Sequence, residues 1–105
     1  MAAMARIRAA VESCPVVLFM KGTPQYPMCG HSARAADVLS QCDAPFHAVN
    51  VLADPEIRAS LPRYSNWPTF PQLFIQGELI GGCDIVVELF EQNRLQQMVA
   101  DAATA

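Results

Sequence analysis

The first half of the chain alternates between helical and strand patterns of apolar side chains. Apolar residues repeat at helical spacing over residues 2–13, and the unbroken apolar run at 16–20 is typical of a buried strand. A loop with one glycine and two prolines follows at 21–28, and a second helix should start just after Cys29. Residues 46–51 are reached through that helical crossover, so they should form a strand parallel to the first.

The second half predicts a short helix, a proline-rich connector and a hairpin. Asp54 and Pro55 mark a helix start, with aspartate as N-cap and proline at the first helical position. Pro62 should end or kink this helix early. Beyond the connector, residues 72–75 and 78–80 are separated by a glutamine–glycine pair and should form a hairpin.

The chain closes on a helical pattern. Gly81 and Gly82 break the strand, and Asp84 should open a last helical stretch. The element order is then α-β-α-β-α-β-β-α, with a parallel βαβ unit before an antiparallel hairpin. This order predicts an α/β protein with the thioredoxin fold, a four-stranded mixed sheet flanked by helices on both faces, in a single domain over residues 1–105.

Composition and charge narrow the class of protein. Hydrophobic residues make up 52% of the chain and charged residues 16%, so it should fold around its own core. The longest clean apolar stretch, residues 16–20, is far short of the roughly 20 residues that a membrane span needs. A net charge of −3 without basic clusters argues against nucleic-acid binding. We therefore expect neither a membrane nor a nucleic acid among the partners.

Cysteine usage favours a reducing compartment. Four cysteines in so short a chain would fit a secreted disulfide scaffold, but the N-terminal segment has the pattern of a helix and not of a signal peptide. Cysteines of cytosolic proteins are more often catalytic, metal-binding or simply buried. The sequence therefore predicts a cytoplasmic protein.

Cys29 is the candidate reactive residue. At a helix start, unpaired backbone N–H groups and the helix dipole would stabilise its thiolate, and Lys21 at the end of the preceding strand would add a positive charge. The alternative is a buried, inert cysteine, the usual fate of a lone one. Ser32 stands where a dithiol oxidoreductase has its second cysteine, so any redox cycle must borrow a thiol from elsewhere.

Three segments carry a family resemblance. They are residues 21–32 (K-G-T-P-x-x-P-x-C-G-x-S), 65–72 (S-N-W-P-T-F-P-Q) and 81–85 (G-G-C-D-I). Together, in order and spacing, they resemble the three signatures of monothiol glutaredoxins of the C-G-F-S class, and the resemblance covers essentially residues 4–100. The family usually has phenylalanine where His31 stands. The resemblance therefore does not define the surroundings of the iron–sulfur cluster that members of this family bind.

The resemblance implies a groove for glutathione. Lys21 and Arg58 match the positions that receive its glycine carboxylate, for which the planar fork of arginine is suited. Pro71 matches the cis proline that faces the active cysteine, and it would turn the backbone of Phe70 outward to pair with the cysteine of glutathione. The alternative for Arg58 is a solvated surface charge, and Pro62 would change how Arg58 is presented.

The other end of glutathione would bind near Cys83 and Asp84. N–H groups at a helix start suit the γ-glutamyl carboxylate, and the Asp84 carboxylate suits its amino group, although Asp84 would equally serve as an N-cap. Cys83 would also be placed to form a disulfide with Cys29 under oxidation. Cys14 and Cys42 end helices and should be small core residues. No pair has C-x-x-C spacing, which argues against a zinc site.

The main activity of the family is to bind a [2Fe–2S] cluster and pass it on. Such a cluster usually has four thiolate ligands. Cys29, as the only protein ligand, and one glutathione supply two, so two protomers and two glutathiones supply four. The resemblance therefore implies a cluster-bridged homodimer that serves iron–sulfur client proteins and iron homeostasis, and a possible heterodimer with a BolA-type protein.

Two rival functions use the same fold. One is a glutathione-dependent thiol-disulfide oxidoreductase that removes glutathione from protein thiols through Cys29. The family's long loop between Lys21 and Cys29, together with Ser32, favours the carrier over efficient turnover. The other rival is a binding module in which the fold only docks partners.

Overall fold

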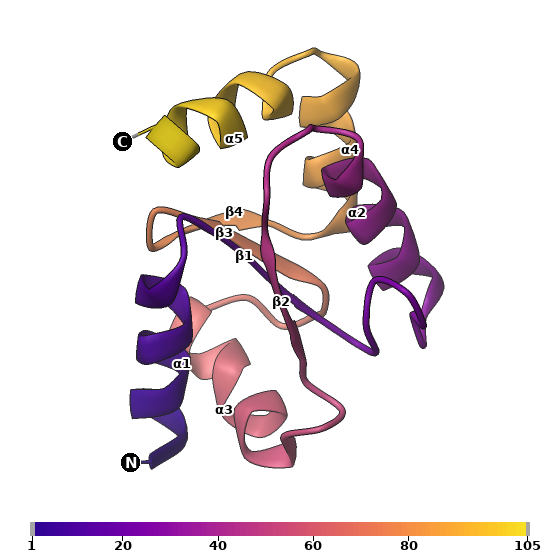
Figure 1. Ribbon diagram of the computed structural model, residues 1–105. Helices are drawn as coiled ribbons and strands as arrows, with labels where there is room; N and C mark the ends of the chain where they lie inside the picture. The colour runs from indigo at the N-terminus through magenta and orange to yellow at the C-terminus, as the bar shows by residue number, and fades with distance from the viewer. Residues whose placement is uncertain (1, 105) are drawn as a thin grey trace.

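Four strands form one mixed sheet in the order β2-β1-β3-β4 (Figure 1). The structure, a computed structural model, describes residues 2–104. The elements follow one another as α1 (Ala2–Ser13), β1 (Val16–Met20), α2 (Gly30–Ser40), β2 (His47–Asn50), α3 (Pro55–Ser65), β3 (Gln72–Ile75), β4 (Glu78–Gly81), α4 (Cys83–Glu91) and α5 (Leu95–Thr104). β1 pairs parallel with β2 and antiparallel with β3, which pairs antiparallel with β4. This confirms the predicted βαβ unit followed by a hairpin.

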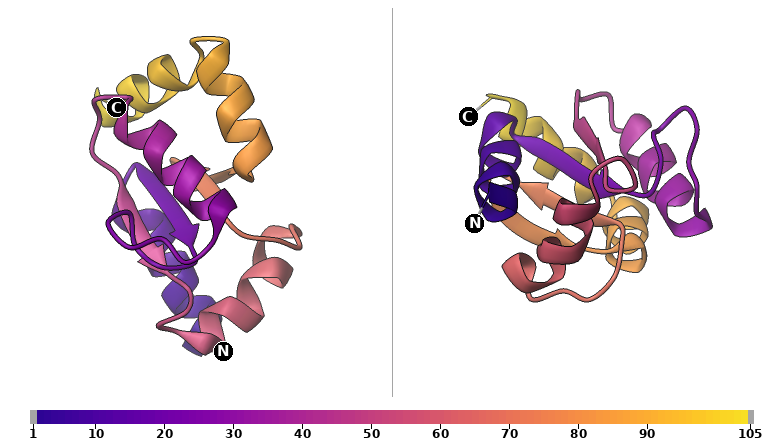
Figure 2. Two further views of the ribbon diagram at one scale, coloured as in Figure 1. Left: turned by 90° about the vertical axis from the view of Figure 1, so that its right-hand side faces the viewer. Right: turned by 90° about the horizontal axis from the view of Figure 1, so that it is seen from below.

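Helices cover both faces of the sheet, α1 and α3 on one and α2, α4 and α5 on the other (Figure 2). The side chains of β1 alternate between the two cores because successive residues of a strand point to opposite faces. Leu18 and Met20 pack with α2, α4 and α5, whereas Val17 and Phe19 pack with α1 and α3. The rings of Phe19 and Phe74 meet edge to face at 5.5 Å between centroids. β1 is therefore the buried centre of the fold, and the loop that follows it is anchored there.

Of the two effects predicted for Pro62, an early end of its helix or a kink, the early end is wrong. α3 continues to Ser65, and Asn66 closes it with a left-handed φ of 54°. A proline inside a helix removes one backbone hydrogen bond. Ile57 and Leu61 of the same helix, however, are buried in the core under α1, and this packing outweighs the missing bond.

The last helical stretch also differs from its prediction. It consists of two helices, and Asn93 between them has a left-handed φ of 58° that apolar periodicity does not reveal. α4 starts at Cys83 with Gly82 as its N-cap, so the expectation that Asp84 caps the helix is wrong. Asp84 lies in the first turn instead, where the helix dipole still stabilises its carboxylate. No helix within residues 2–104 is long and apolar enough to cross a membrane.

We expect Leu61→Ala to destabilise the protein by about 2–5 kcal/mol, because it opens a cavity in a fully buried part of the core. Leu52→Ala is a matched control at an exposed position and should stay within about 0.5 kcal/mol of the native protein. Urea unfolding measures both. Equal decreases in the free energy of unfolding of Leu61→Ala and Leu52→Ala would show that burial of Leu61 does not hold α3 in place.

Candidate functional site

Cys29 is the N-cap residue of α2. Its backbone is extended (φ −156°, ψ 147°), and its carbonyl accepts the N–H of Ala33 at 2.9 Å. Its sulfur accepts the N–H of Ser32 at 3.4 Å. The Cys29 thiol is partly exposed, whereas Cys42 and Cys83 are buried. Cys29 thus lies at the helix start that the sequence predicts, with its sulfur beside the N–H groups of the first turn.

Ser32 links Cys29 to the end of β1. Its side chain is fully buried, and its hydroxyl oxygen accepts the N–H of Lys21 at 3.0 Å. The sulfur of Cys29 lies 3.5 Å from the same oxygen. Because a hydroxyl group rotates, Ser32 accepts a hydrogen bond from the thiol and donates one to the thiolate. The sequence did not predict this contact of Ser32, although the i, i+3 spacing from Cys29 is a signal for it.

The site lowers the pKa of the Cys29 thiol. Burial acts to raise this pKa. Hydrogen bonds from the Ser32 side chain, from the N–H groups of Ser32 and His31, and the charge of Lys21 together outweigh burial, so the pKa falls below its ordinary value. A larger fraction of the side chain is then thiolate, which is the form that attacks disulfides and binds metals.

The two buried thiols behave in the opposite way. Burial raises the pKa of Cys83, as do the nearby Asp84 and Cys29, against the opposing charge of Arg34. Burial raises the pKa of Cys42 as well. Of these three thiols, only Cys29 has a lowered pKa and therefore a larger fraction of reactive thiolate.

A hydrogen-bonded loop joins β1 to α2. The N–H of Met28 donates to the carbonyl of Lys21 at 2.9 Å, and Thr23 and Tyr26 exchange two N–H···O bonds at 3.1 Å. Gly22 has a φ of +92°, and a Cβ there would lie 2.5 Å from the carbonyl oxygen of Tyr26. Only glycine fits this position. The loop therefore holds a defined conformation beside the reactive thiol.

A groove of about 360 Å³ lies between the connector after α3 and the start of α4. It is lined by His31, Trp67, Thr69, Phe70, Gly82, Cys83, Asp84 and Ile85. The peptide bond between Phe70 and Pro71 is cis, as the resemblance implies. The buried side-chain amide of Gln72 donates to the carbonyls of Trp67 at 2.9 Å and Thr69 at 3.2 Å, which fixes the connector that forms one wall.

The groove brings together three of the residues expected to bind glutathione: Phe70, Cys83 and Asp84. It also contains His31, which stands where the family that the sequence resembles usually has phenylalanine. Trp67 lines the groove too, and the sequence interpretation did not assign it there. Its place as the first residue of the proline-rich connector, residues 67–71, was the available signal.

Lys21 and Arg58 do not line this groove. Lys21 follows β1 and is half-buried, and Arg58 is exposed on α3. Lys21 thus lies where the parallel pair of β1 and β2 ends, and α3 is the helix that follows β2. Within residues 2–104 every ion pair is made by Arg6, so neither Lys21 nor Arg58 is paired with a carboxylate.

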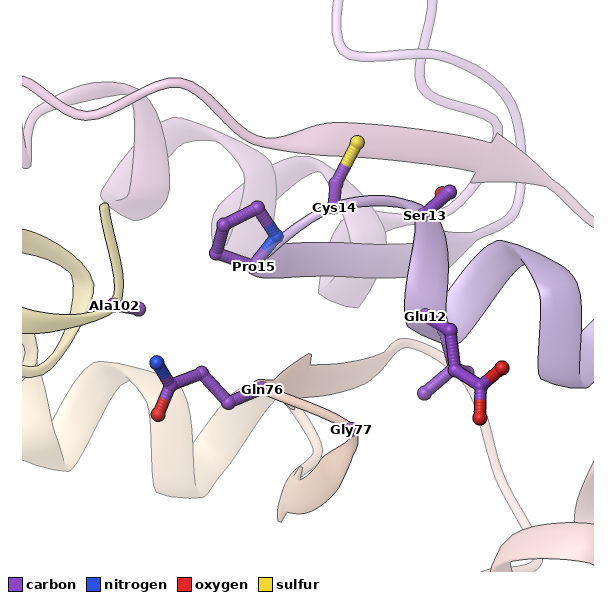
Figure 3. Close-up of a pocket in the computed structure, with 8 residues that line it drawn as sticks. Glu12, Ser13, Cys14, Pro15, Gln76, Gly77 and Ala102 are labelled. Atoms are coloured by element: carbon purple, nitrogen blue, oxygen red, sulfur yellow. The ribbon is translucent and has the colours of Figure 1, made fainter. Parts of the chain in front are cut away.

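The remaining cysteines lie away from this chemistry. Cys42 is buried, as expected of a core residue, with its sulfur 3.4 Å from the carbonyl oxygen of Val38. Cys14 is only half-buried and borders a second cavity of about 410 Å³. Gln76 lines the other side of that cavity, and the sulfur of Cys14 points away from it (Figure 3). All four thiols are free, and in the described part of the chain no three His, Cys, Asp or Glu side chains gather as a metal site.

We expect Ser32→Ala to raise the pKa of the Cys29 thiol, because the thiolate loses the hydroxyl donor that stabilises it. The pH dependence of alkylation by iodoacetamide, followed at Cys29 by mass spectrometry, measures this pKa. Ser40→Ala removes a hydroxyl from the far end of α2 and should leave it unchanged. A Cys29 pKa that stays equal or falls in Ser32→Ala would contradict the role given to Ser32.

Comparison with known proteins agrees with this geometry. Residues 16–80 match the family model described as Glutaredoxin. The chain is 51% identical over 98 residues to a protein named Glutaredoxin 4 from Pasteurella multocida, which covers 93% of this chain and 90% of the relative.

Solved structures give the same result. The solution structure of reduced poplar apo GrxS14 superposes with a TM-score of 0.84 at 44% identity, over the whole length of both chains. The crystal structure of a buckwheat glutaredoxin–glutathione complex has a TM-score of 0.84 at 28% identity, over 96% of this chain and 90% of that one. With one cysteine at the helix start and Ser32 in place of a second, this chain belongs to the glutaredoxin family, in its monothiol class.

Proposed function

We propose that the protein binds a [2Fe–2S] cluster together with glutathione and carries it, as cargo, to acceptor proteins. The observation that carries the proposal is a single thiol of lowered pKa at a helix start, accompanied by a serine instead of a second cysteine. A [2Fe–2S] cluster usually has four thiolate ligands. Cys29 offers one, so two chains with two glutathiones complete the set.

Glutathione would bind between the connector and the start of α4. The backbone of Phe70 would pair with its cysteine. The N–H groups around Cys83 and Asp84 would receive its γ-glutamyl carboxylate, and the exposed Asp84 side chain would take its amino group. Lys21 and Arg58 would take the glycine carboxylate. The glutathione complex of the buckwheat relative, which shares this fold, supports the assignment.

The ligand set suits a carrier more than a permanent electron-transfer protein. Two of the four thiolates would belong to small molecules that dissociate, so the cluster would be released readily. We propose a cluster-bridged homodimer in the cytoplasm, iron–sulfur proteins as clients, a role in iron homeostasis, and a BolA-type protein as an alternative partner.

A glutathione-dependent oxidoreductase is the second candidate, and the lowered pKa of Cys29 favours it. The Cys29 thiolate would attack the disulfide of a glutathionylated protein, form a mixed disulfide with glutathione and release the protein thiolate. A second glutathione thiolate would then attack the mixed disulfide, release glutathione disulfide and restore Cys29. Because Ser32 cannot resolve the mixed disulfide within the chain, we favour the carrier.

Replacing the proposed ligand tests the carrier directly. After anaerobic reconstitution with iron, sulfide and glutathione, Cys29→Ser should show no visible absorption, because the chain then lacks its thiol of lowered pKa, and the buried thiol of Cys83, whose pKa is raised, should not replace it. Cys14→Ser and Cys42→Ser are matched controls that should keep the colour of the native protein. Colour that survives in Cys29→Ser would exclude Cys29 as the ligand.

Installing a second thiol tests why the oxidoreductase is disfavoured. Ser32→Cys should raise the rate of glutathione-dependent disulfide reduction, since an internal thiol can then resolve the mixed disulfide. Ser32→Ala controls for loss of the hydroxyl. An unchanged rate in Ser32→Cys would mean that the loop before Cys29, and not the missing thiol, limits turnover.

A further inference from the structure

The side chain of Asn50, the last residue of β2, joins two segments that lie far apart in the sequence. Its Oδ1 atom accepts the N–H of Gly22 at 2.9 Å and the N–H of Leu52 at 3.0 Å. Gly22 belongs to the loop before Cys29, and Leu52 lies in the turn that leads into α3. One oxygen atom therefore holds both segments at the edge where the parallel pair of β1 and β2 ends.

The conformation of the loop depends on this contact. Gly22 is buried, and within residues 2–104 its N–H donates its hydrogen bond to Oδ1 of Asn50. A buried N–H that loses its acceptor is destabilising, so without Oδ1 the backbone at Gly22 would move towards another partner. Lys21 is the residue directly before Gly22 and would move with it.

The backbone of Asn50 adds a further contact on the path to α3. The N–H of Ala53 donates to the backbone carbonyl of Asn50 at 3.1 Å, and Asp54 caps α3 by accepting the N–H of Ile57 at 3.2 Å. Arg58 follows in the next turn, with its N–H on the carbonyl of Asp54 at 3.0 Å. Hydrogen bonds thus hold the short turn between Asn50 and Asp54 at both ends, and this turn leads into the helix that carries Arg58.

Within the described residues, neither Lys21 nor Arg58 is neutralised by a carboxylate, so both can bind an anion. Arg6 on α1 pairs with Asp54 at 2.9 Å and with Glu56 at 3.0 Å, the two carboxylates at the start of α3. These carboxylates are therefore occupied by Arg6 and do not pair with Arg58. Lys21, the only lysine in the sequence, also makes no ion pair within the described residues.

We propose that Asn50 is a positioning residue that sets the loop carrying Lys21 against the helix carrying Arg58, so that both cations reach one carboxylate. Asn50 does not touch that carboxylate; it acts through the N–H groups of Gly22 and Leu52. The inference rests on the proposed function, in which the carboxylate is the glycine end of glutathione.

The test compares two ligands that differ only at that end. Glutathione and glutathione monoethyl ester, whose glycine carboxylate is esterified, are titrated into the reduced full-length protein and followed by NMR. A charge-assisted contact to the carboxylate should make the native protein prefer glutathione by about tenfold. Asn50→Leu, which keeps the size of the side chain but removes the acceptor, should reduce this preference to less than about threefold by weakening glutathione alone.

Two controls separate positioning from general destabilisation. Val99→Ala truncates the core at α5, far from the loop, and should lower the melting temperature while leaving the preference intact. In a Lys21→Gln background, which has already lost one of the cations, Asn50→Leu should have little further effect on the preference. Asn50→Ser, with a shorter side chain that cannot span both N–H groups, replaces Asn50→Leu if that variant does not fold.

The outcomes distinguish failure of the glycine-carboxylate site from failure of the positioning role of Asn50. A native protein that binds both ligands equally would overturn the glycine-carboxylate assignment in the proposed function. A native protein that prefers glutathione, with the same preference retained in Asn50→Leu or Asn50→Ser, would overturn the role of Asn50 alone.

Discussion

The hydrogen bonds that converge on the Ser32 hydroxyl are the interaction on which the site depends. The hydroxyl accepts the N–H of Lys21 as β1 ends and contacts the sulfur of Cys29 as α2 begins. Since every residue of β1 is buried, this contact ties the reactive thiol to the core of the fold. The acceptor bond from Lys21 also orients the hydroxyl, and hydrogen bonds in such a series strengthen one another. A stabilised thiolate at a defined position follows.

One thiol with these properties restricts what the protein can do. It cannot complete a dithiol cycle within the chain, because the position three residues on carries a hydroxyl. It can share a metal cluster, provided that other thiolates arrive with a second chain and with glutathione. The connector wall of the groove, the start of α4 and the cations Lys21 and Arg58 would then have complementary roles, since each of the three would hold a different part of a tripeptide with a carboxylate at either end.

Local patterns predicted much of this structure. The continuous apolar run of β1, the hairpin and the helix start at Cys29 all depend on neighbouring residues and were correct. Tertiary packing decided the rest: buried Leu61 carries α3 past Pro62, and Gly82 replaces Asp84 as the cap of α4. The groove walls and the bonds of Asn50 join segments distant in sequence, which no local pattern reports.

The most direct test of the account is the composition of the coloured species. Native protein reconstituted without oxygen is separated by size exclusion, and iron, acid-labile sulfide, glutathione and protein are quantified in the coloured peak. We expect a dimer with equal amounts of iron, sulfide, glutathione and protein chain, as two chains sharing one [2Fe–2S] cluster require. A coloured monomer, or a coloured dimer without glutathione, would contradict it.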